Sequence, residues 1–591
     1  MRRRRLSLPL ALVIAFAAGC TTNTELAQTT KASTPTNAGA ENLTLALDSL
    51  RKLSEADDYQ PAQRTIFYLN QWLSAEPAAA GAWEPDRLIR SLPRALRELP
   101  TADPQKPDDQ PWIKDLSKLQ FHGDDLDEIQ YLQQNQWLHD VAEHVRREPP
   151  TPRLKPWLKE IEASVGLPEA EQLATAERLL DWTTRNIQLD SLPPMPKEPL
   201  ATAGTPEAAL PSARGEIGPG YGHTPLEILL YGHGDAQERA RIFILLCRQV
   251  GIDAVMLAFP EEQSTSRRGW LPAALIGGKL YLFDTALGLP IPGAEGKGIA
   301  TLDQVRKDLA ILRQLDVKGV GEYPVTPSDF KQGIWALIDA EPPALSRRMA
   351  LLSASMPSAT KLALATQPSQ IEAAMRKSNS IDGVSLWRVP FDALMYRVGR
   401  EQRAGNDQHL AAQLTLMRFL FQPDRPLLKG RNLHLQGRFE NEDRKAGARS
   451  LYLQCRKSDR EIDALVTNEF YRKMAGIERQ LPENPQQREA AIKAISDVAR
   501  LEKFYATFWL GLTYFEAGRY DAAIEWLGER TVQVSPPSPW TPAARYNLSR
   551  CYEQLGKLDL ARQWLESDKD SPQRLGNMVR ARMLKAETSS E

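Results

Sequence analysis

Cysteine is scarce in this chain, with only four among 591 residues. Cys20 lies near the N-terminus, and Cys247, Cys455 and Cys551 are widely spaced. This spacing excludes a framework of several disulfide bonds, although it leaves a single bridge open. Histidine is also rare, with seven residues, and their spacing is not typical of metal ligands. The sequence therefore predicts no metal site and no other cofactor.

An excess of basic charge is absent as well. The chain has 74 lysines and arginines against 75 aspartates and glutamates, a formal net charge of −1. No basic patch interleaved with aromatic residues stands out, which argues against a dedicated nucleic-acid binder. Apolar runs of spanning length, about 20 residues, are also missing. We therefore expect the mature chain to be soluble apart from any lipid anchor.

The N-terminus has the parts of an export signal. Four arginines at positions 2–5 precede an apolar run at 6–16, and small residues lead to Cys20. Ending at a cysteine, the segment resembles the lipobox of bacterial lipoproteins, in which that cysteine is lipidated and becomes the first residue. A cleaved signal with Cys20 there by chance is the alternative. Because Thr21 rather than aspartate follows, the resemblance implies an anchor in the outer membrane of a bacterial envelope, facing the periplasm.

The chain after Cys20 begins with a tether and continues with helices. Residues 21–40 are small and polar without an aromatic side chain, which is typical of a flexible tether. From residue 43 to about 147, apolar residues recur at spacings of three and four, as at Leu43, Leu47 and Leu50. This periodicity predicts amphipathic helices.

A second region, residues 221–284, alternates helix and strand patterns. We predict a helix at 236–250 and strands at 254–259, 270–276 and 279–283. Gly277 and Gly278 between the last two strands predict a hairpin, since both turn positions tolerate positive φ. A helix at 168–190 precedes this part of the chain.

The helix signature of this region resembles that of transglutaminase-like domains, which have a papain-related fold. It reads Gly234, Glu238 and Ala240, then an apolar run, Arg248 and Gly251-Ile252. In that family a Gly-x-Cys turn opens a buried helix, and a His and an Asp follow on two adjacent strands. The resemblance implies that the Cys position is Ala236, the His position Arg268 and the Asp position Asp284.

Only one of the three catalytic residue types remains at these positions. Alanine offers no nucleophile, and arginine stays protonated, so it cannot serve as a base. Cys247 lies 11 residues after Ala236, about 16 Å along the helix, and belongs to an apolar stripe that indicates a core position. The domain is therefore predicted to be non-catalytic, with Arg268 paired to Asp284 and both facing the turn at Ala236.

A papain-like hydrolase or acyl transferase with a displaced nucleophile is the alternative. Its nucleophile would be Ser264, Thr265 or Ser266, with His223 or His233 as the base. A two-histidine site with Asp235 is also conceivable, but the spacing favours histidines in loops or on the surface. A third alternative is a cleft that binds peptide or glycan without cleaving it.

The C-terminal part contains an internal repeat with a period of 38 residues. Tyr514, Gly518 and Ala523 in the first copy correspond to Tyr552, Gly556 and Ala561 in the second. The pattern resembles tetratricopeptide repeats, in which small residues let two antiparallel helices approach and a glycine makes the turn. Stacked helical hairpins usually form a concave surface that binds proteins. We therefore expect a protein partner on this region.

Together these patterns predict an α+β chain that is mainly helical. The expected parts are a signal peptide (1–20), a tether (21–40), a helical region (41–150), a transglutaminase-like domain (155–300), a connecting region (301–385) and a helical repeat domain (386–591). The predicted function is that of a lipid-anchored envelope protein that binds or scaffolds other proteins.

Overall fold

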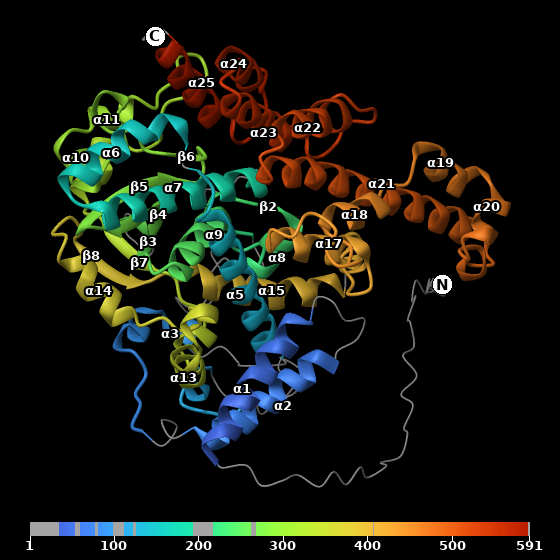
Figure 1. The fold of residues 1–591 in the computed structure, drawn as a ribbon, viewed down its shortest axis with the longest axis horizontal. Helices are drawn as coiled ribbons and strands as arrows, with labels where there is room; N and C mark the ends of the chain where they lie inside the picture. Colours follow the sequence, from blue (N-terminus) through green and yellow to red (C-terminus); the bar gives the residue numbers. More distant parts are fainter. Residues whose placement is uncertain are drawn as a thin grey trace, which may run out of the picture.

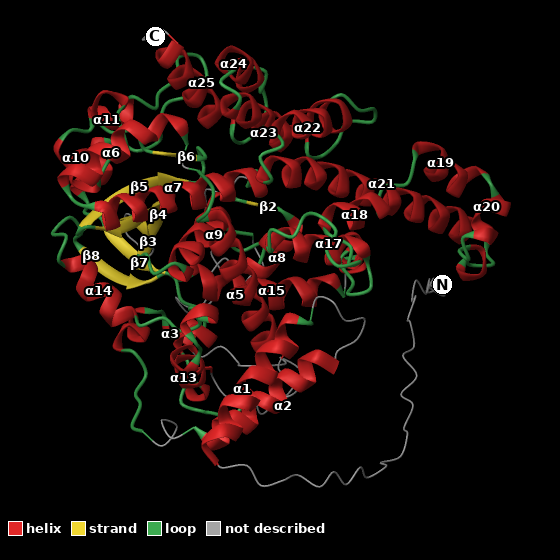
Figure 2. Ribbon diagram, viewed as in Figure 1, coloured by secondary structure: helices red, strands yellow, loops and turns green. Residues whose placement is uncertain are grey.

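A computed structural model of the chain describes residues 35–53, 60–76, 81–97, 112–121, 126–149, 151–192, 217–261, 267–405 and 407–588. Cys20, the tether up to residue 34 and Ser264–Ser266 lie outside the described residues. The described part is mostly helical with a small sheet and C-terminal helical repeats (Figures 1 and 2), which agrees with the predicted α+β class at this level. None of the described helices is long and apolar enough to cross a bilayer.

The N-terminal helices confirm the helical periodicity of this segment. Helices α1 (Pro35–Arg51) and α2 (Gln60–Ala75) pack together, and their apolar stripes enter one core cluster with α5 (Leu126–Val145). The same cluster includes Met349 and Leu352 of α13 (Arg347–Ser355), so this region shares a core with a later part of the chain. Short elements between α2 and α5 are η2 (Arg87–Ser91), α3 (Arg94–Arg97) and α4 (Trp112–Asp115).

The main sheet has six strands in the order β6-β5-β4-β3-β7-β8. All neighbours are antiparallel except β7 and β8, which are parallel. Gly277 and Gly278 join β4 to β5 with φ of 55° and 74°, which confirms the predicted hairpin. The strands are β3 (Ala254–Pro260), β4 (Arg267–Ile276), β5 (Lys279–Asp284), β6 (Leu289–Pro290), β7 (Trp335–Ile338) and β8 (Gly383–Leu386).

Two strands come from the segment that we expected to be a connection. Residues 301–385 contribute β7 and all but the last residue of β8, which extend the sheet beyond β3. Each has only four residues, too short to show a periodicity that separates it from a loop. The helices of this segment are α10 (Leu302–Lys307), α11 (Ala310–Arg313), α12 (Pro327–Lys331), α13 and α14 (Pro368–Arg376).

The sheet separates two apolar cores. Helices α7 (Leu167–Asn186) and α9 (Ala236–Gln249) cover one face and meet Tyr281 and Phe283 of β5 there. Leu280 and Leu282, which alternate with these residues, enter the core on the opposite face. Helix α5 also packs in the core on the α7 side. Other elements on this side are α6 (Lys155–Ser164), α8 (Pro225–Tyr231) and a two-stranded parallel sheet of β1 (Gln188–Leu189) and β2 (His233–Gly234).

The C-terminal third of the chain, after β8, is helical in its described residues, and its last helices lie against the sheet region (Figure 1). Its α-helices are α15 (Val389–Ala404), α16 (Gln408–Leu420), α17 (Pro426–Leu435), α18 (Ala448–Gln454), α19 (Asp459–Thr467), α20 (Glu469–Met474), α21 (Pro485–Glu516), α22 (Tyr520–Ile524), α23 (Thr541–Gln554), α24 (Leu558–Glu566) and α25 (Arg574–Thr588). A π-helical stretch, η8 (Glu525–Val532), continues α22. The other short helices are η3 (Pro152–Leu154), η4 (Ala294–Gly296), η5 (Pro343–Leu345), η6 (Ser358–Thr360) and η7 (Glu478–Gln480).

Candidate functional site

Ala236 is the first residue of α9, as the alignment predicts for the Cys position. Asp235 caps this helix, and its Oδ1 accepts hydrogen bonds from the N–H groups of Gln237 at 2.7 Å and Glu238 at 2.9 Å. Its Oδ2 accepts from the N–H of Gly220 at 2.7 Å. Burial and the neighbouring Glu238 raise the pKa of Asp235 to about 7. A carboxyl group therefore satisfies the N–H groups that would favour a thiolate at this turn.

Arg268 does not face α9, and its predicted pairing with Asp284 is wrong. Its guanidinium lies 2.5 Å from the carboxylate of Asp329 in α12 and 5.5 Å from the ring centre of Phe259. Phe259 belongs to the core on the sheet face opposite α9. The residue of β4 that approaches α9 is Gly269, where an added Cβ would lie 3.1 Å from the Nε2 of Gln237. Beside this stretch, the pairing of β3 with β4 shifts register, and a one-residue slip moves a side chain to the other face.

The carboxylate of Asp284 accepts three hydrogen bonds from nearby groups. Its Oδ2 accepts the phenolic hydrogen of Tyr323 at 2.6 Å, and its Oδ1 accepts the N–H groups of Ala286 and Leu287, both at 2.9 Å. Burial raises the pKa of this carboxyl group, although these hydrogen bonds oppose the shift. Asp284 thus holds the turn after β5 on the face away from α9.

One part of the predicted neighbourhood is present next to Asp284. The hydroxyl of Thr285 donates to the carbonyl oxygen of Ala236 at 2.8 Å, so the end of β5 reaches the first turn of α9. The strand end and the helix start therefore meet, but the side chains at the His and Asp positions point elsewhere. The contact at this junction joins a hydroxyl to a backbone carbonyl, which is a structural link.

The three described cysteines are free and buried. Burial raises the pKa of the Cys247 thiol well above its ordinary value, as expected for a core position. None of the hydrogen bonds of His223 or His233 within the described residues involves a thiol or a hydroxyl group. His233 instead lies 2.6 Å from Asp190, and His223 lies 3.3 Å from Glu238.

The turns of the repeats lie where the sequence predicts them. Gly518 follows α21 with φ of 71°, and Gly556 follows α23 with φ of 70°; each connects two helices. Both values lie in the left-handed region that glycine adopts without steric cost. Tyr514 packs against the apolar cluster that contains Ala523, and Tyr552 packs against the cluster that contains Ala561.

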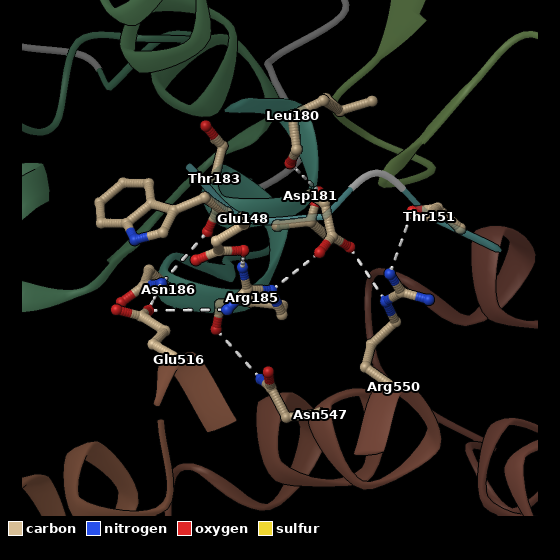
Figure 3. Close-up of polar contacts among 12 residues, drawn as sticks. Glu148, Thr151, Leu180, Asp181, Thr183, Arg185, Asn186, Glu516, Asn547 and Arg550 are labelled. Atoms are coloured by element: carbon tan, nitrogen blue, oxygen red, sulfur yellow. Dashed lines mark hydrogen bonds and ion pairs between the residues drawn. The ribbon is translucent and has the colours of Figure 1, made fainter. Parts of the chain in front are cut away.

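The inner helices of the repeats pack on the chain's own helix α7. Arg550 of α23 donates to Asp181 of α7 at 2.9 Å, and the other oxygen of Asp181 accepts from Arg185 at 2.9 Å (Figure 3). The amide of Asn547 donates to the carbonyl oxygen of Arg185 at 3.0 Å. Arg185 also lies 4.4 Å above the ring of Phe515 in α21. The face of the repeats that usually binds partner proteins is therefore occupied within the chain at this place.

Glu516, at the end of α21, is the centre of a second group of buried charges. Its Oε1 accepts a hydrogen bond from the side-chain amide of Asn186 at 2.7 Å (Figure 3). Its Oε2 lies 3.2 Å from His144 and 3.4 Å from His434. Burial alone would raise the pKa of Glu516, but the two histidines hold it well below its usual range. One carboxylate thus joins helices α5, α7, α17 and α21.

A cavity of about 250 Å³ lies at the seam between α7 and the repeats. Glu148 borders it with a pKa that burial raises to about 7, and Glu177 borders it with a pKa that burial also raises. Sequence reasoning did not find this seam, because Asp181 and Arg550 are 369 residues apart and no local pattern relates them. The available signal was the presence of arginines and glutamates among apolar residues on the same predicted helix face.

Two family models match the C-terminal part of the chain, and both describe a tetratricopeptide repeat. They cover residues 486–539 and 542–567. Neither a curated protein nor a solved structure matches the chain. The comparisons show no transglutaminase-like domain, so the likeness of residues 221–284 to that family stays a prediction. The helices from α21 to α24 are two tetratricopeptide repeats, a module typical of protein–protein interaction.

Proposed function

We propose that this chain is a non-catalytic, lipid-anchored protein of a bacterial envelope that binds a protein partner through its helical repeats. The observation that carries the proposal is the pair of repeats at residues 486–567, because stacked helical hairpins present extended surfaces to other proteins. The lipid anchor rests on the sequence around Cys20, and the absence of catalysis rests on Ala236.

The partner surface follows from the seam with α7. Since α21 and α23 face α7, the side left for a partner is the outer one, formed by α22, η8 and α24. Glu529, Asp559 and Gln563 are exposed on these outer elements. A partner that binds there leaves the buried charges of the seam in place, so binding does not require the fold to open.

Photocrosslinking in the native envelope tests this surface. A photoreactive amino acid at position 529, 559 or 563 should give a discrete adduct with one protein, identified by mass spectrometry. The control is the same amino acid at Lys52, which is exposed and directly follows α1, a helix whose core cluster contains no residue of the repeats. Adducts from Lys52 alone, or none from the three outer positions, would contradict the proposed surface.

The anchor is tested separately. The full chain should partition into detergent with the membrane and incorporate labelled fatty acid, and Cys20→Ser should remove the label. Unchanged membrane association of that variant, with no label on the wild type, would remove the anchor from the proposal and leave the repeats unaffected.

The non-catalytic part is supported by the absence of a thiol at Ala236 and by the burial of Cys247. A hydrolase with a displaced nucleophile remains a second candidate, because His233 is held by Asp190 at 2.6 Å as a general base would be. Purified protein should show no transglutaminase, amidase or protease turnover and no labelling by thiol- or serine-directed probes. Labelling that depends on His233 would favour the hydrolase.

A further inference from the structure

His223 lies just before α8 and His233 lies in β2, and their side chains are next to each other. Their ring centres are 5.2 Å apart and the ring planes are nearly perpendicular, at 85°. Both side chains keep partial access to solvent, with exposed fractions of 22% and 25%. Their separation of ten positions along the chain gave no indication of this proximity, which depends on the fold of α8 and the turn at Gly232.

Each ring is oriented by a carboxylate on the same nitrogen. The Nδ1 of His223 lies 3.3 Å from Glu238, and the Nδ1 of His233 lies 2.6 Å from Asp190. In the neutral ring, a carboxylate at Nδ1 favours the tautomer with the proton on that nitrogen, which leaves the lone pair on Nε2. Neither Nε2 has a hydrogen-bond partner among the described residues. Carboxylate–histidine pairs of this kind are typical of the ligands of a bound metal ion.

The separation of the rings fits a shared metal ion. A zinc–nitrogen bond of about 2.0–2.1 Å places the metal about 3.2 Å from the centre of an imidazole ring. Two such rings at a tetrahedral angle have centres about 5.2 Å apart. The observed 5.2 Å equals this value. An edge-to-face contact of two rings has a similar spacing, so the separation permits a shared ion, and it is the orientation of the two Nδ1 atoms that favours a metal.

The charges around the pair also suit a cation. Three carboxylates, Glu238, Glu227 and Asp190, interact electrostatically with His223. Glu227 is paired with Arg400 at 3.5 Å, whereas Glu238 and Asp190 each lie against one of the two histidines. Imidazole ligands suit zinc, copper and nickel, whereas magnesium and calcium prefer oxygen. The aromatic ring of Tyr231 packs beside both histidines and limits access from that side.

We propose that His223 and His233 bind a divalent transition metal, with zinc as the natural candidate, and that Asp190 and Glu238 orient the two ligands. Among the described residues, no group of three His, Cys, Asp or Glu side chains forms a metal cage. Two protein ligands leave at least two positions of a tetrahedral ion for water, so the ion remains accessible and its affinity is modest.

Metal titration of the purified, mature-length chain tests this site. The protein is prepared without a histidine tag and stripped with a chelator, then titrated with zinc by calorimetry and with Cu²⁺ by electron paramagnetic resonance. We expect one equivalent to bind with a dissociation constant in the micromolar range, and the Cu²⁺ spectrum to show hyperfine lines from two imidazole nitrogens. No binding at millimolar metal would overturn the proposal.

Matched variants locate the site. His223→Gln or His233→Gln should weaken binding at least tenfold, and the double variant should abolish it. Asp190→Asn should weaken binding about 10- to 100-fold while the stoichiometry stays at one. His139→Gln, a histidine of α5 outside the pair, is the control and should bind as the wild type does. Circular dichroism confirms that each variant is folded, and metal binding that survives in the folded double variant would place the ion elsewhere.

Discussion

Arg550 in the second repeat donates its Nε–H to Asp181 in α7 across 2.9 Å, although 369 residues separate the two along the chain. Both side chains are largely buried, with exposed fractions of 1% and 13%. The pairing joins the repeats to the helix that covers the sheet. Its contribution to the free energy of unfolding can be measured directly.

Replacing Arg550 by methionine should destabilise the whole chain by about 3–5 kcal/mol, because removing one partner of a buried ion pair leaves the other charge uncompensated. Urea unfolding followed by tryptophan fluorescence measures this loss. Arg530→Met is the control, since Arg530 pairs with Glu525 where both are more than 40% exposed. It should change the free energy of unfolding by less than about 1 kcal/mol. Equal effects of the two variants would contradict the importance of the seam.

Glu148 should make the stability of the seam depend on pH. Burial raises the pKa of Glu148 to about 7, even though Arg185 opposes the shift. The unfolded value is about 4.3, so between about pH 4.3 and 7 the folded state binds more protons than the unfolded state. The free energy of unfolding therefore decreases as the pH rises from 5 to 8.

His144 acts in the same direction. Burial lowers its pKa, but the hydrogen bond to Glu516 outweighs this and raises it. A raised histidine pKa gives stability that is present below the unfolded pKa and is lost as the pH rises through the folded value.

The contribution of Glu148 is tested by urea unfolding of the wild type and Glu148→Gln between pH 5 and 8. The advantage of the wild type should fall by up to about 3 kcal/mol across this range, whereas a constant difference would exclude Glu148 as the titrating group.

Gly556 should tolerate asparagine better than alanine. Its φ of 70° is in the left-handed region, and an added Cβ would meet no heavy atom within 4 Å. The cost of Gly556→Ala is therefore backbone strain alone, about 1–2 kcal/mol. Gly556→Asn should cost less, because asparagine visits this conformation. Thermal unfolding ranks the three proteins, and an asparagine variant less stable than the alanine variant would show that something other than φ decides.

Arg268 and Asp284 should be energetically independent. Arg268 is paired with Asp329, whereas Asp284 accepts hydrogen bonds from Tyr323 and two backbone N–H groups. Asp284→Ala should cost at least about 2 kcal/mol, since it leaves buried donors unsatisfied. Arg268→Ala should cost less than about 1 kcal/mol. A double-mutant cycle should give a coupling energy below about 0.5 kcal/mol; a larger coupling would restore the direct pair predicted from the alignment.

The local elements of this chain were predictable because each has a complete pattern in its own segment. Helix α9 has a capping box at Asp235 and Glu238 and an apolar stripe, and the β4–β5 hairpin has two glycines in its turn. The repeat turns at Gly518 and Gly556 were found for the same reason. Secondary structure of this kind depends on neighbours in the sequence, which the sequence shows directly.

The arrangement around the predicted site depended on features that no segment shows alone. The register shift where β3 pairs with β4 decides which face Arg268 occupies, and nothing in Arg267-Arg268-Gly269 reveals it. The proximity of His223 and His233 and the bond from Arg550 to Asp181 arise from packing between distant elements. Alignment with a family motif predicts where a residue lies along a strand. A single register shift in the strand then decides on which face of the sheet its side chain lies.

The seam also imposes an order on the assembly of the chain. When α7 has been synthesised, the residues that complete its polar contacts, from Glu516 to Arg550, have yet to be added. Until then Asp181 and Arg185 lack several of their final partners, and the helix cannot reach its native stability. A chain truncated before α23 should therefore remain a substrate for proteases and chaperones even though its sheet is complete. The last tenth of the sequence thus determines whether the preceding residues resist proteolysis.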